Sequence, residues 1–373
     1  MDFIDLKTQQ IRIRSRIEKN IQAVLDHGQY IMGPEILKLE SRLAEFAGVK
    51  HAVSCASGTD ALLMTLMAYD IGPGDAVFTT PFTFVATAEA IRLLGATPVF
   101  VDIDPVTFNI DPKRLREALL AHAQTETGLA ARGILPVDLF GLPADYDAIR
   151  AVAREHGLFV LEDAAQSFGA EYRGRKAGAL GDAAATSFFP AKPLGAYGDG
   201  GMCFTDDDAL AAALRSVRIH GMGADKYDNV RIGINGRMDT IQAAVLLAKL
   251  DIFPEEVQLR QTVAGRYTRT LAGVVTPTVP EGLLSAWAQY SVLAEDARHR
   301  EALQARLKAA GIPTAVYYPI PLHLQTAYTS LGGKPGDFPV TEDCANRIFS
   351  LPMHPYLSAE DQERIAAVFL GRS

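Results

Sequence analysis

The sequence predicts an α/β protein with a mostly parallel sheet and helices on both faces. Short apolar runs alternate with helical patterns from residue 50 to about residue 220. These runs are apolar at nearly every position, which is typical of strands that helices cover on both sides. After Gly273 the chain changes to turns and short strands, which indicates a smaller second domain.

The order of the expected elements follows from these patterns and from helix-breaking residues. We expect strands over residues 76–80, 98–102, 133–137 and 158–162, and helices over residues 85–94, 112–121 and 145–156. Gly157 is a typical helix end. A helical pattern over residues 239–273 contains Pro254, which kinks or breaks a helix. A strand over residues 288–293 and a helix over residues 298–310 follow. We expect a large domain over residues 1–255, with an N-terminal segment, and a small α+β domain over residues 256–373.

The composition is that of a globular protein and excludes several classes of function. The 373 residues are 48% hydrophobic and carry a net charge of −8 without a long basic run, so nucleic acid and anionic membranes are not expected partners. The three cysteines stand far apart, and no C-x-x-C or H-E-x-x-H pattern occurs, so no metal site is expected. No apolar run reaches the roughly 20 residues of a membrane span. We expect a soluble, cytoplasmic protein.

Lys192 is the first candidate catalytic residue. Pro190 and Pro193 bracket it, so it cannot lie inside a regular helix. A strand-like run precedes it and a glycine-rich loop follows. A lysine held on such a bend can point its amine into a cleft, where burial lowers its proton affinity and makes it a nucleophile. The alternative is a solvated loop lysine.

A second segment, Cys55-Ala-Ser-Gly-Thr-Asp-Ala-Leu62, predicts a helix that begins with small residues. Free amides and the dipole at such a helix end attract phosphate. Gly58 allows close backbone approach, and Thr59 supplies a hydroxyl. A helix cap without a ligand is the alternative for this segment.

A third segment, Val160-Leu-Glu-Asp-Ala-Ala-Gln-Ser167, ends an apolar strand with Glu162 and Asp163. Ligands of parallel sheets bind beyond the carboxyl ends of the strands. Asp163 could therefore pair with a protonated ring nitrogen, or alternatively cap the next helix. A nucleophilic lysine, a carboxylate at a strand end and a phosphate-binding helix end together are what pyridoxal 5'-phosphate (PLP) requires.

The same residues belong to a set of motifs found in order over nearly the whole chain. The chain resembles the DegT/DnrJ/EryC1/StrS family of sugar aminotransferases, which have the aspartate-aminotransferase fold (PLP fold type I). The matching stretches include Ser57-Gly-Thr-Asp-Ala-Leu62, Pro81-Phe-Thr-Phe-Val-Ala-Thr87, Glu162-Asp-Ala-Ala-Gln166, Ser187-Phe-Phe-Pro-Ala-Lys192, Gly198-Asp-Gly-Gly201, Gly233-Ile-Asn-Gly-Arg-Met-Asp239 and Tyr318-Pro-Ile-Pro-Leu-His-Leu-Gln325.

The resemblance implies roles for eight residues toward the cofactor. Lys192 matches the Schiff-base lysine that also moves the proton between cofactor and substrate, and Asp163 matches the partner of the ring nitrogen. Phe84 matches the aromatic ring stacked on the pyridine, and Gln166 lies near the phenolic oxygen. The matches to phosphate ligands are Gly58, Thr59, Ser187 and Asn235. Because the family's asparagine reaches in from the other subunit, the resemblance also implies a homodimer with shared active sites.

Two details depart from the family's common pattern. Gly236 stands where serine is usual, and Asp228-Asn229 replaces a stretch that usually contains histidine. Both positions lie near the expected entrance for the sugar nucleotide, so they affect the substrate assignment more than the reaction class.

The resemblance implies an aminotransferase that takes an amino group from glutamate, forms pyridoxamine phosphate and aminates a keto sugar on a nucleoside diphosphate. A sugar dehydratase of the same family is one alternative, but those enzymes carry histidine in place of Lys192. A non-catalytic PLP-binding regulator is another. We would expect such a regulator to have an added basic DNA-binding segment, whereas this chain is acidic.

The motifs favour the branch of the family that aminates C3, and within it UDP-2-acetamido-3-keto-glucuronate, a precursor of bacterial surface polysaccharide such as lipopolysaccharide O-antigen. This substrate and glutamate both carry a carboxylate, so one arginine could serve both. Arg237 is the first candidate, with ordering of the entrance loop as its alternative, and Arg231 is the second. Tyr318 and His323 could contact the sugar or simply pack in the small domain. The alternative substrate is a 3-keto or 4-keto 6-deoxy sugar on dTDP, UDP or GDP.

Overall fold

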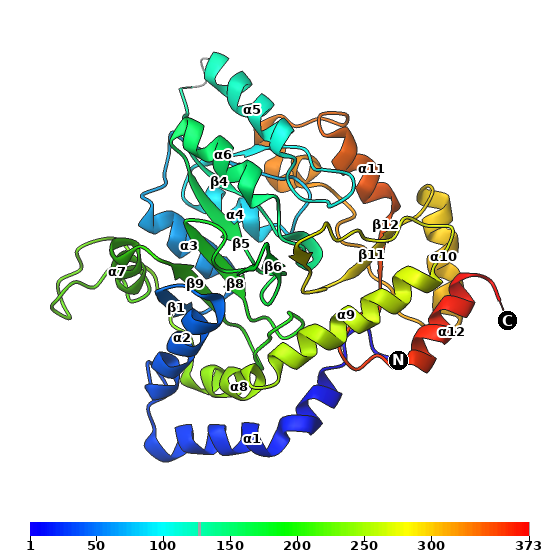
Figure 1. The fold of residues 1–373 in the computed structure, drawn as a ribbon. Helices are drawn as coiled ribbons and strands as arrows, with labels where there is room; N and C mark the ends of the chain where they lie inside the picture. The colour runs from blue at the N-terminus through cyan, green and yellow to red at the C-terminus, as the bar shows by residue number, and fades with distance from the viewer. Residues whose placement is uncertain (126–127, 373) are drawn as a thin grey trace.

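A computed structural model describes residues 1–125 and 128–372 of the chain. Figure 1 shows a large domain around a central sheet and a smaller C-terminal domain, which α9 joins to it. The helices are α1 (Leu6–His27), α2 (Pro34–Ala47), α3 (Gly58–Ala68), α4 (Ala86–Leu93), α5 (Pro112–Gln124), α6 (Tyr146–His156), α7 (Asp208–Val217), α8 (Thr240–Leu250), α9 (Phe253–Thr270), α10 (Ala297–Ala309), α11 (Pro339–Arg347) and α12 (Ala359–Phe369). Short 3₁₀ helices are η1 (Leu139–Gly141), η2 (Leu322–Leu324) and η3 (Thr326–Leu331).

The central sheet has seven strands in the order β1-β9-β8-β5-β4-β2-β3. They are β1 (His51–Cys55), β2 (Asp75–Thr79), β3 (Thr97–Phe100), β4 (Ala130–Leu135), β5 (Phe159–Asp163), β8 (Ala183–Ser187) and β9 (Gly201–Thr205). The run from β8 to β3 is parallel, whereas β9 is antiparallel to both of its neighbours. The predicted α/β class with a mostly parallel sheet is confirmed, and the antiparallel β9 is a feature that the sequence patterns did not indicate.

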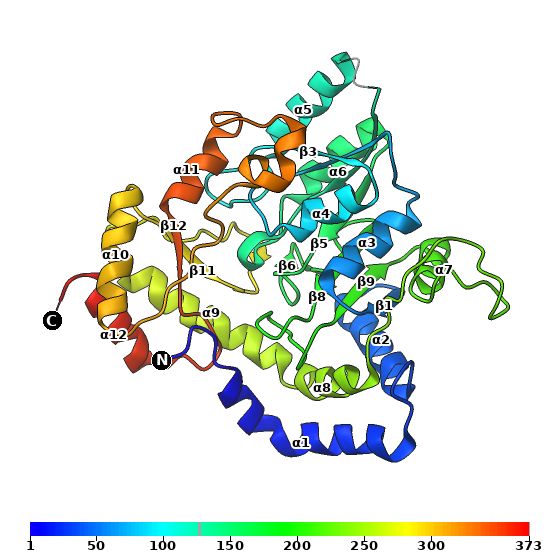
Figure 2. The same ribbon diagram turned by 180° about the vertical axis from the view of Figure 1, so that it is seen from behind.

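Helices bury both faces of this sheet, as the uniformly apolar strands predict. On one face, α2, α8 and the start of α9 pack against the side containing Ala184 and Phe204. On the other face, α3, α4 and α7 cover the side containing Leu161 and Cys203. Figure 2 shows α3 and α4 lying on the opposite side of the sheet from α8.

The remaining strands form two small sheets. A three-stranded sheet contains β6 (Glu171–Tyr172), β7 (Arg175–Lys176) and β10 (Leu283–Leu284), and a two-stranded sheet in the small domain contains β11 (Tyr290–Leu293) and β12 (Ile348–Leu351). The small-domain core gathers α9, α10 and α12 around these last two strands, with Tyr267, Tyr290 and Phe349 fully buried.

Helix α9 contributes to both hydrophobic cores. Phe253 and Val257 belong to the large-domain core, and Val263 and Tyr267 to the small-domain core. Pro254 lies in the first turn of α9, where a missing N–H costs nothing, so it separates α8 from α9 rather than kinking one long helix. The division of the chain at residues 255 and 256 falls within α9 and stays a prediction.

The N-terminal segment lies against the small domain and along α8. The backbone N–H of Met353 donates to the carbonyl of Phe3 at 3.2 Å. Helix α1 then runs beside α8, and the two figures agree on this placement. Among the described residues, no helix is both long and apolar enough to span a membrane.

Replacing Phe168 by alanine tests the packing beneath the sheet. The Phe168 ring is 1% exposed and stacks on Phe204 and Phe253, with ring centroids 5.5 and 5.9 Å away. The cavity left by Phe168→Ala is expected to lower the free energy of unfolding by about 3–5 kcal/mol in denaturant titrations. Phe189→Ala is the control, because that ring is 52% exposed. Equal losses in both variants would contradict this description of the core.

Candidate active site

The carboxyl ends of two neighbouring parallel strands define the candidate site. Strand β5 ends at Asp163 and β8 ends at Ser187, and the two strands pair in parallel. Helix α3 begins at Gly58 against the same edge, because a Cβ added at Gly58 would lie 2.6 Å from the Ser187 Cβ. The structure therefore brings together Asp163, Ser187 and the helix end that the sequence proposes for phosphate.

Asp163 is buried, and hydrogen bonds fix its carboxylate. Thr87 Oγ1 donates to Oδ2 at 2.8 Å, and the Ala165 N–H donates to Oδ1 at 3.2 Å. Burial raises the pKa of Asp163 above its ordinary value, while these two bonds and the charge of Lys192 act to lower it. A protonated nitrogen facing this carboxylate would lower the pKa again, since an opposite charge favours the ionised form.

Lys192 lies at the turn of a closely packed loop. The backbone N–H of Lys192 donates to the Phe189 carbonyl at 2.9 Å, and the backbone N–H of Ala196 donates to the Phe188 carbonyl at 2.7 Å. Gly195 closes the loop, because a Cβ there would lie 2.4 Å from the Pro190 carbonyl oxygen. Burial lowers the pKa of the Lys192 amine, and the charge of Asp163 partly offsets this shift. The loop thus holds an amine with reduced proton affinity near the buried carboxylate.

The N-terminus of α3 has the geometry expected of an anion site. Ser57 caps the helix by accepting from the Asp60 N–H at 3.0 Å, and Gly58 and Thr59 follow in the first turn. Both are half-buried, as is Ser187. Free amides of a first helical turn and two hydroxyls suit a phosphate.

Gln166, Tyr318 and Phe84 lie together beside this edge. Gln166 is buried, its Oε1 accepts from the Phe140 N–H at 2.8 Å, and its Nε2 donates to the Tyr318 hydroxyl at 3.2 Å. The Phe84 ring lies 6.3 Å from the Tyr318 ring and is 54% exposed. An exposed aromatic ring next to a buried carboxylate and amine suits stacking on a planar heterocycle.

The segment 233–239 contacts the N-terminal end of α3. The Ala56 N–H donates to the Gly236 carbonyl at 3.0 Å, and a Cβ at Gly236 would lie 2.8 Å from the Met64 sulfur. A serine at position 236 would therefore require Met64 to shift. Asn235 is exposed on this segment, while the Nε of Arg237 is buried and has no hydrogen-bond partner among the described residues.

Arg231 and His323 lie in different surroundings. Arg231 is exposed. It lines a surface hollow together with His220 and its own neighbours in the segment 229–233. His323 is buried, and its Nε2 lies 3.1 Å from Glu342 Oε1 in the small domain. This contact with Glu342 favours the packing interpretation of His323, whereas Tyr318 lies beside Gln166 and accepts its hydrogen bond.

Three residues without an assigned role support the site. Thr87 holds Asp163, and the buried Asp138 lies next to the Asp163 turn. Lys249 of α8 is buried and donates to the Gly195 carbonyl at 2.7 Å, so it fixes the Lys192 loop. Thr87 lies within a motif of the sequence, but the signal for Lys249 is only a cation within an apolar helical run.

These residues fit PLP. The half-buried amine, the buried carboxylate, the exposed ring of Phe84 and the capped helix end provide a partner for each part of the cofactor. Fold and site together define a PLP-dependent aminotransferase of the aspartate-aminotransferase fold. The chain belongs to the DegT/DnrJ/EryC1/StrS aminotransferase family, whose profile matches residues 11–370.

Individual proteins resemble the chain over almost its full length. It is 51% identical over 369 residues to UDP-2-acetamido-2-deoxy-3-oxo-D-glucuronate aminotransferase of Pseudomonas aeruginosa, covering 98% of this chain and 99% of that protein. A crystal structure of a family aminotransferase from Brucella abortus has a TM-score of 0.96 and 52% identity, covering 100% of this chain and 99% of that one. NtdA from Bacillus subtilis, solved with bound pyridoxamine phosphate (PMP), has a TM-score of 0.89 and 29% identity. The match covers 99% of this chain and 82% of that one.

Lys192→Ala is expected to abolish amino transfer and the visible absorbance of lysine-bound PLP, because no other amine of the loop can replace the nucleophile. Absorbance spectra of the variant with added PLP measure this loss. Lys113→Ala, at an exposed lysine of α5, is the control and should keep both properties. Retained turnover in Lys192→Ala would contradict the assignment.

The burial of Lys249 predicts that the stability of the folded protein depends on pH. Burial lowers its pKa from 10.5 to about 8. Between these values the unfolded chain binds the proton and the folded chain does not, so this residue makes stability rise with pH, by up to about 1.4 kcal/mol per pH unit. The difference in unfolding free energy between wild type and Lys249→Met should therefore rise from pH 8 to pH 10. A difference that stays flat over this range would show that Lys249 is charged in the folded protein.

Proposed function

We propose that this protein transfers an amino group from glutamate to C3 of UDP-2-acetamido-2-deoxy-3-oxo-D-glucuronate. The observation that carries the choice of substrate is the 51% identity, over nearly the whole of both chains, to an aminotransferase named for that sugar. The product would serve bacterial surface polysaccharide synthesis, such as O-antigen of lipopolysaccharide, in the cytoplasm. The alternative is 3- or 4-amination of a keto-6-deoxy sugar on dTDP, UDP or GDP.

The arrangement of the site supports a division of roles among its residues. Bound PLP supplies an electron sink for the carbanion that amino transfer requires. Asp163 holds a proton on the ring nitrogen, and the Lys192 amine, which burial favours in its uncharged form, accepts and returns the proton that the reaction moves. Gly58, Thr59 and Ser187 bind the phosphate, Gln166 lies at the phenolic oxygen, and Phe84 stacks on the ring. The presence of Lys192 argues against a dehydratase.

A homodimer is part of this proposal. The loop after α7 extends away from the body of the molecule, as both views show. It carries Tyr227 and Ile232, which are 85% and 84% exposed. Exposed apolar side chains on a projecting loop are typical of an interaction site. The segment that follows this loop presents the exposed Asn235, which would complete the phosphate site of the other subunit.

The test is an assay of purified protein with glutamate and the UDP-linked 3-keto sugar acid. The proposal predicts formation of 2-oxoglutarate together with a UDP-sugar that carries a new amine, both detected by mass spectrometry. A dTDP-linked 3-keto-6-deoxy sugar serves as the competing substrate. Preference for the neutral sugar would support the alternative, and no amine on any sugar would support a regulator.

Arg237→Lys is expected to weaken use of the sugar acid about 10- to 100-fold in kcat/KM, while a neutral keto sugar is affected less. A guanidinium binds a carboxylate through two parallel hydrogen bonds. A hydrogen bond to a charged group contributes about 1.5–3 kcal/mol. The buried, unpartnered Nε of Arg237 supports this role. Arg231→Lys, at an exposed arginine, is the comparison. Equal losses for acidic and neutral sugars would favour loop ordering instead.

A further inference from the structure

The segment Pro136–Gly141 follows β4 and lies beside the turn from Asp163 to Ser167. The Asp163 N–H donates to the Pro136 carbonyl at 2.9 Å, and the Asp138 N–H donates to the Asp163 carbonyl at 3.1 Å. Ser167 Oγ donates to Asp138 Oδ2 at 2.8 Å. Together with the bond from the Phe140 N–H to Gln166, these four bonds tie the turn to the segment at both of its ends.

Asp138 makes two of these four bonds and is fully buried. Besides Ser167, its carboxylate accepts from the Ala144 N–H and from the Tyr146 hydroxyl, each at 2.9 Å. Three donors on one buried carboxyl stabilise the ionised form, which offsets part of the cost of burial. The side chain therefore both fixes the turn and provides a negative charge beneath it.

Other titratable groups surround this carboxylate. Among the described residues, Glu162 and Asp163 face it from β5, and Tyr146 faces it from α6. Glu162 is also fully buried and accepts from the Gly178 and Leu180 N–H groups at 2.7 and 2.9 Å. Burial raises the pKa of Asp138 to about 7 and the pKa of Glu162 well above its ordinary value. Because two adjacent buried carboxyls do not both ionise readily, Asp138, which has three donors and the less strongly raised pKa, is the one of the two that ionises first.

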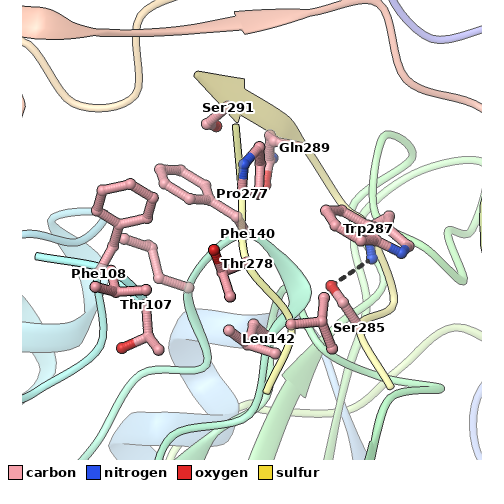
Figure 3. A pocket seen from close by; sticks show the side chains of 13 residues that line it. Thr107, Phe108, Phe140, Leu142, Pro277, Thr278, Ser285, Trp287, Gln289 and Ser291 are labelled. Carbon is pink, nitrogen blue, oxygen red and sulfur yellow. Dashed lines mark hydrogen bonds between the residues drawn. The ribbon is translucent and has the colours of Figure 1, made fainter. Parts of the chain in front are cut away.

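The backbone after Asp138 is bent in a way that serves Gln166. Phe140 has φ +58°, a left-handed conformation that costs a bulky residue about 1–2 kcal/mol. Figure 3 shows the Phe140 side chain among Phe108 and Trp287 at a small pocket between the domains. Gly141 follows with φ +102°, and a Cβ there would lie 2.7 Å from the Trp287 N atom. Packing against the small domain thus maintains the bend that directs the Phe140 N–H at Gln166.

We propose that Asp138 is a positioning residue, which fixes the turn that carries Asp163 and Gln166 and whose negative charge favours protonated forms of the bound cofactor. The inference rests on the proposed roles of Asp163 and Gln166. Asp138 touches neither substrate nor cofactor: it acts through the turn that carries these two residues and through its charge beneath that turn.

The test is a pH titration of the visible absorbance band of the PLP-loaded protein. Asp138→Asn keeps the size of the side chain but removes its charge, so protonated forms of the cofactor become less favourable. The midpoint of the titration should fall by roughly half a pH unit or more, and PLP should be released several-fold faster. Asp102→Asn is the matched control, because Asp102 is also a buried carboxylate with several donors but binds Val340 and Thr341 of the small domain.

A second variant keeps the inference testable if Asp138→Asn does not fold. Ser167→Ala removes one bond to Asp138 and leaves the carboxylate, so it should speed PLP release with a smaller change in the midpoint. Release at the wild-type rate from Ser167→Ala, or a midpoint of Asp138→Asn equal to that of Asp102→Asn, would overturn the inference while the proposed function stands. A wild-type protein without a visible PLP band would overturn both the positioning role of Asp138 and the proposed function.

Discussion

The active site depends on the parallel pairing of β5 and β8, which brings the ends of both strands to one edge of the sheet. Each strand is followed at once by a turn. The pairing of the two strands is therefore enough to place Asp163 next to the loop of Lys192. The helices that cover both faces of the sheet bury the strands up to the ends that carry these groups. That burial raises the proton affinity of the carboxylate and lowers that of the amine. The same physical cause thus prepares both groups for PLP chemistry.

Much of the remaining structure maintains this arrangement. Helix α8 contributes Lys249, whose amine also lies 4.5 Å from the centre of the Tyr197 ring, so the helix holds the far side of the Lys192 loop. The segment Pro136–Gly141 holds the Asp163 turn from the other side and is itself packed against Trp287. The small domain therefore acts on the site through packing at the domain boundary as well as through Tyr318. Buried polar groups such as Thr87, Asp138 and Lys249 are costly when unpaired. They lie beneath the site because their hydrogen bonds hold its few reacting groups in place.

The sequence could predict the strands, and it could put Lys192 and Asp163 forward as candidates, for a physical reason. Apolar runs, prolines and glycines act locally, so β5, the loop of Lys192 and the helix break at Pro254 were all visible in the pattern. The antiparallel direction of β9 was not, because strand direction is set by partners far apart in sequence. The supporting roles of Thr87, Asp138 and Lys249 depend on contacts across the fold, so neither the motif around Thr87 nor the cation in the apolar run of α8 could assign them. His323 shows the opposite case: it stands in a motif, but its Glu342 partner and burial are visible only in three dimensions.

We propose above all that the Lys192 amine and the Asp163 carboxylate bind PLP for amino transfer. The most direct measurement is an absorbance spectrum of the purified protein before and after the addition of glutamate. We expect a visible cofactor band that glutamate converts to the shorter-wavelength absorbance of pyridoxamine phosphate, with 2-oxoglutarate released in equal amount. A band that glutamate leaves unchanged would contradict glutamate as the donor, and no band even after PLP is added would contradict the assignment of Lys192 itself.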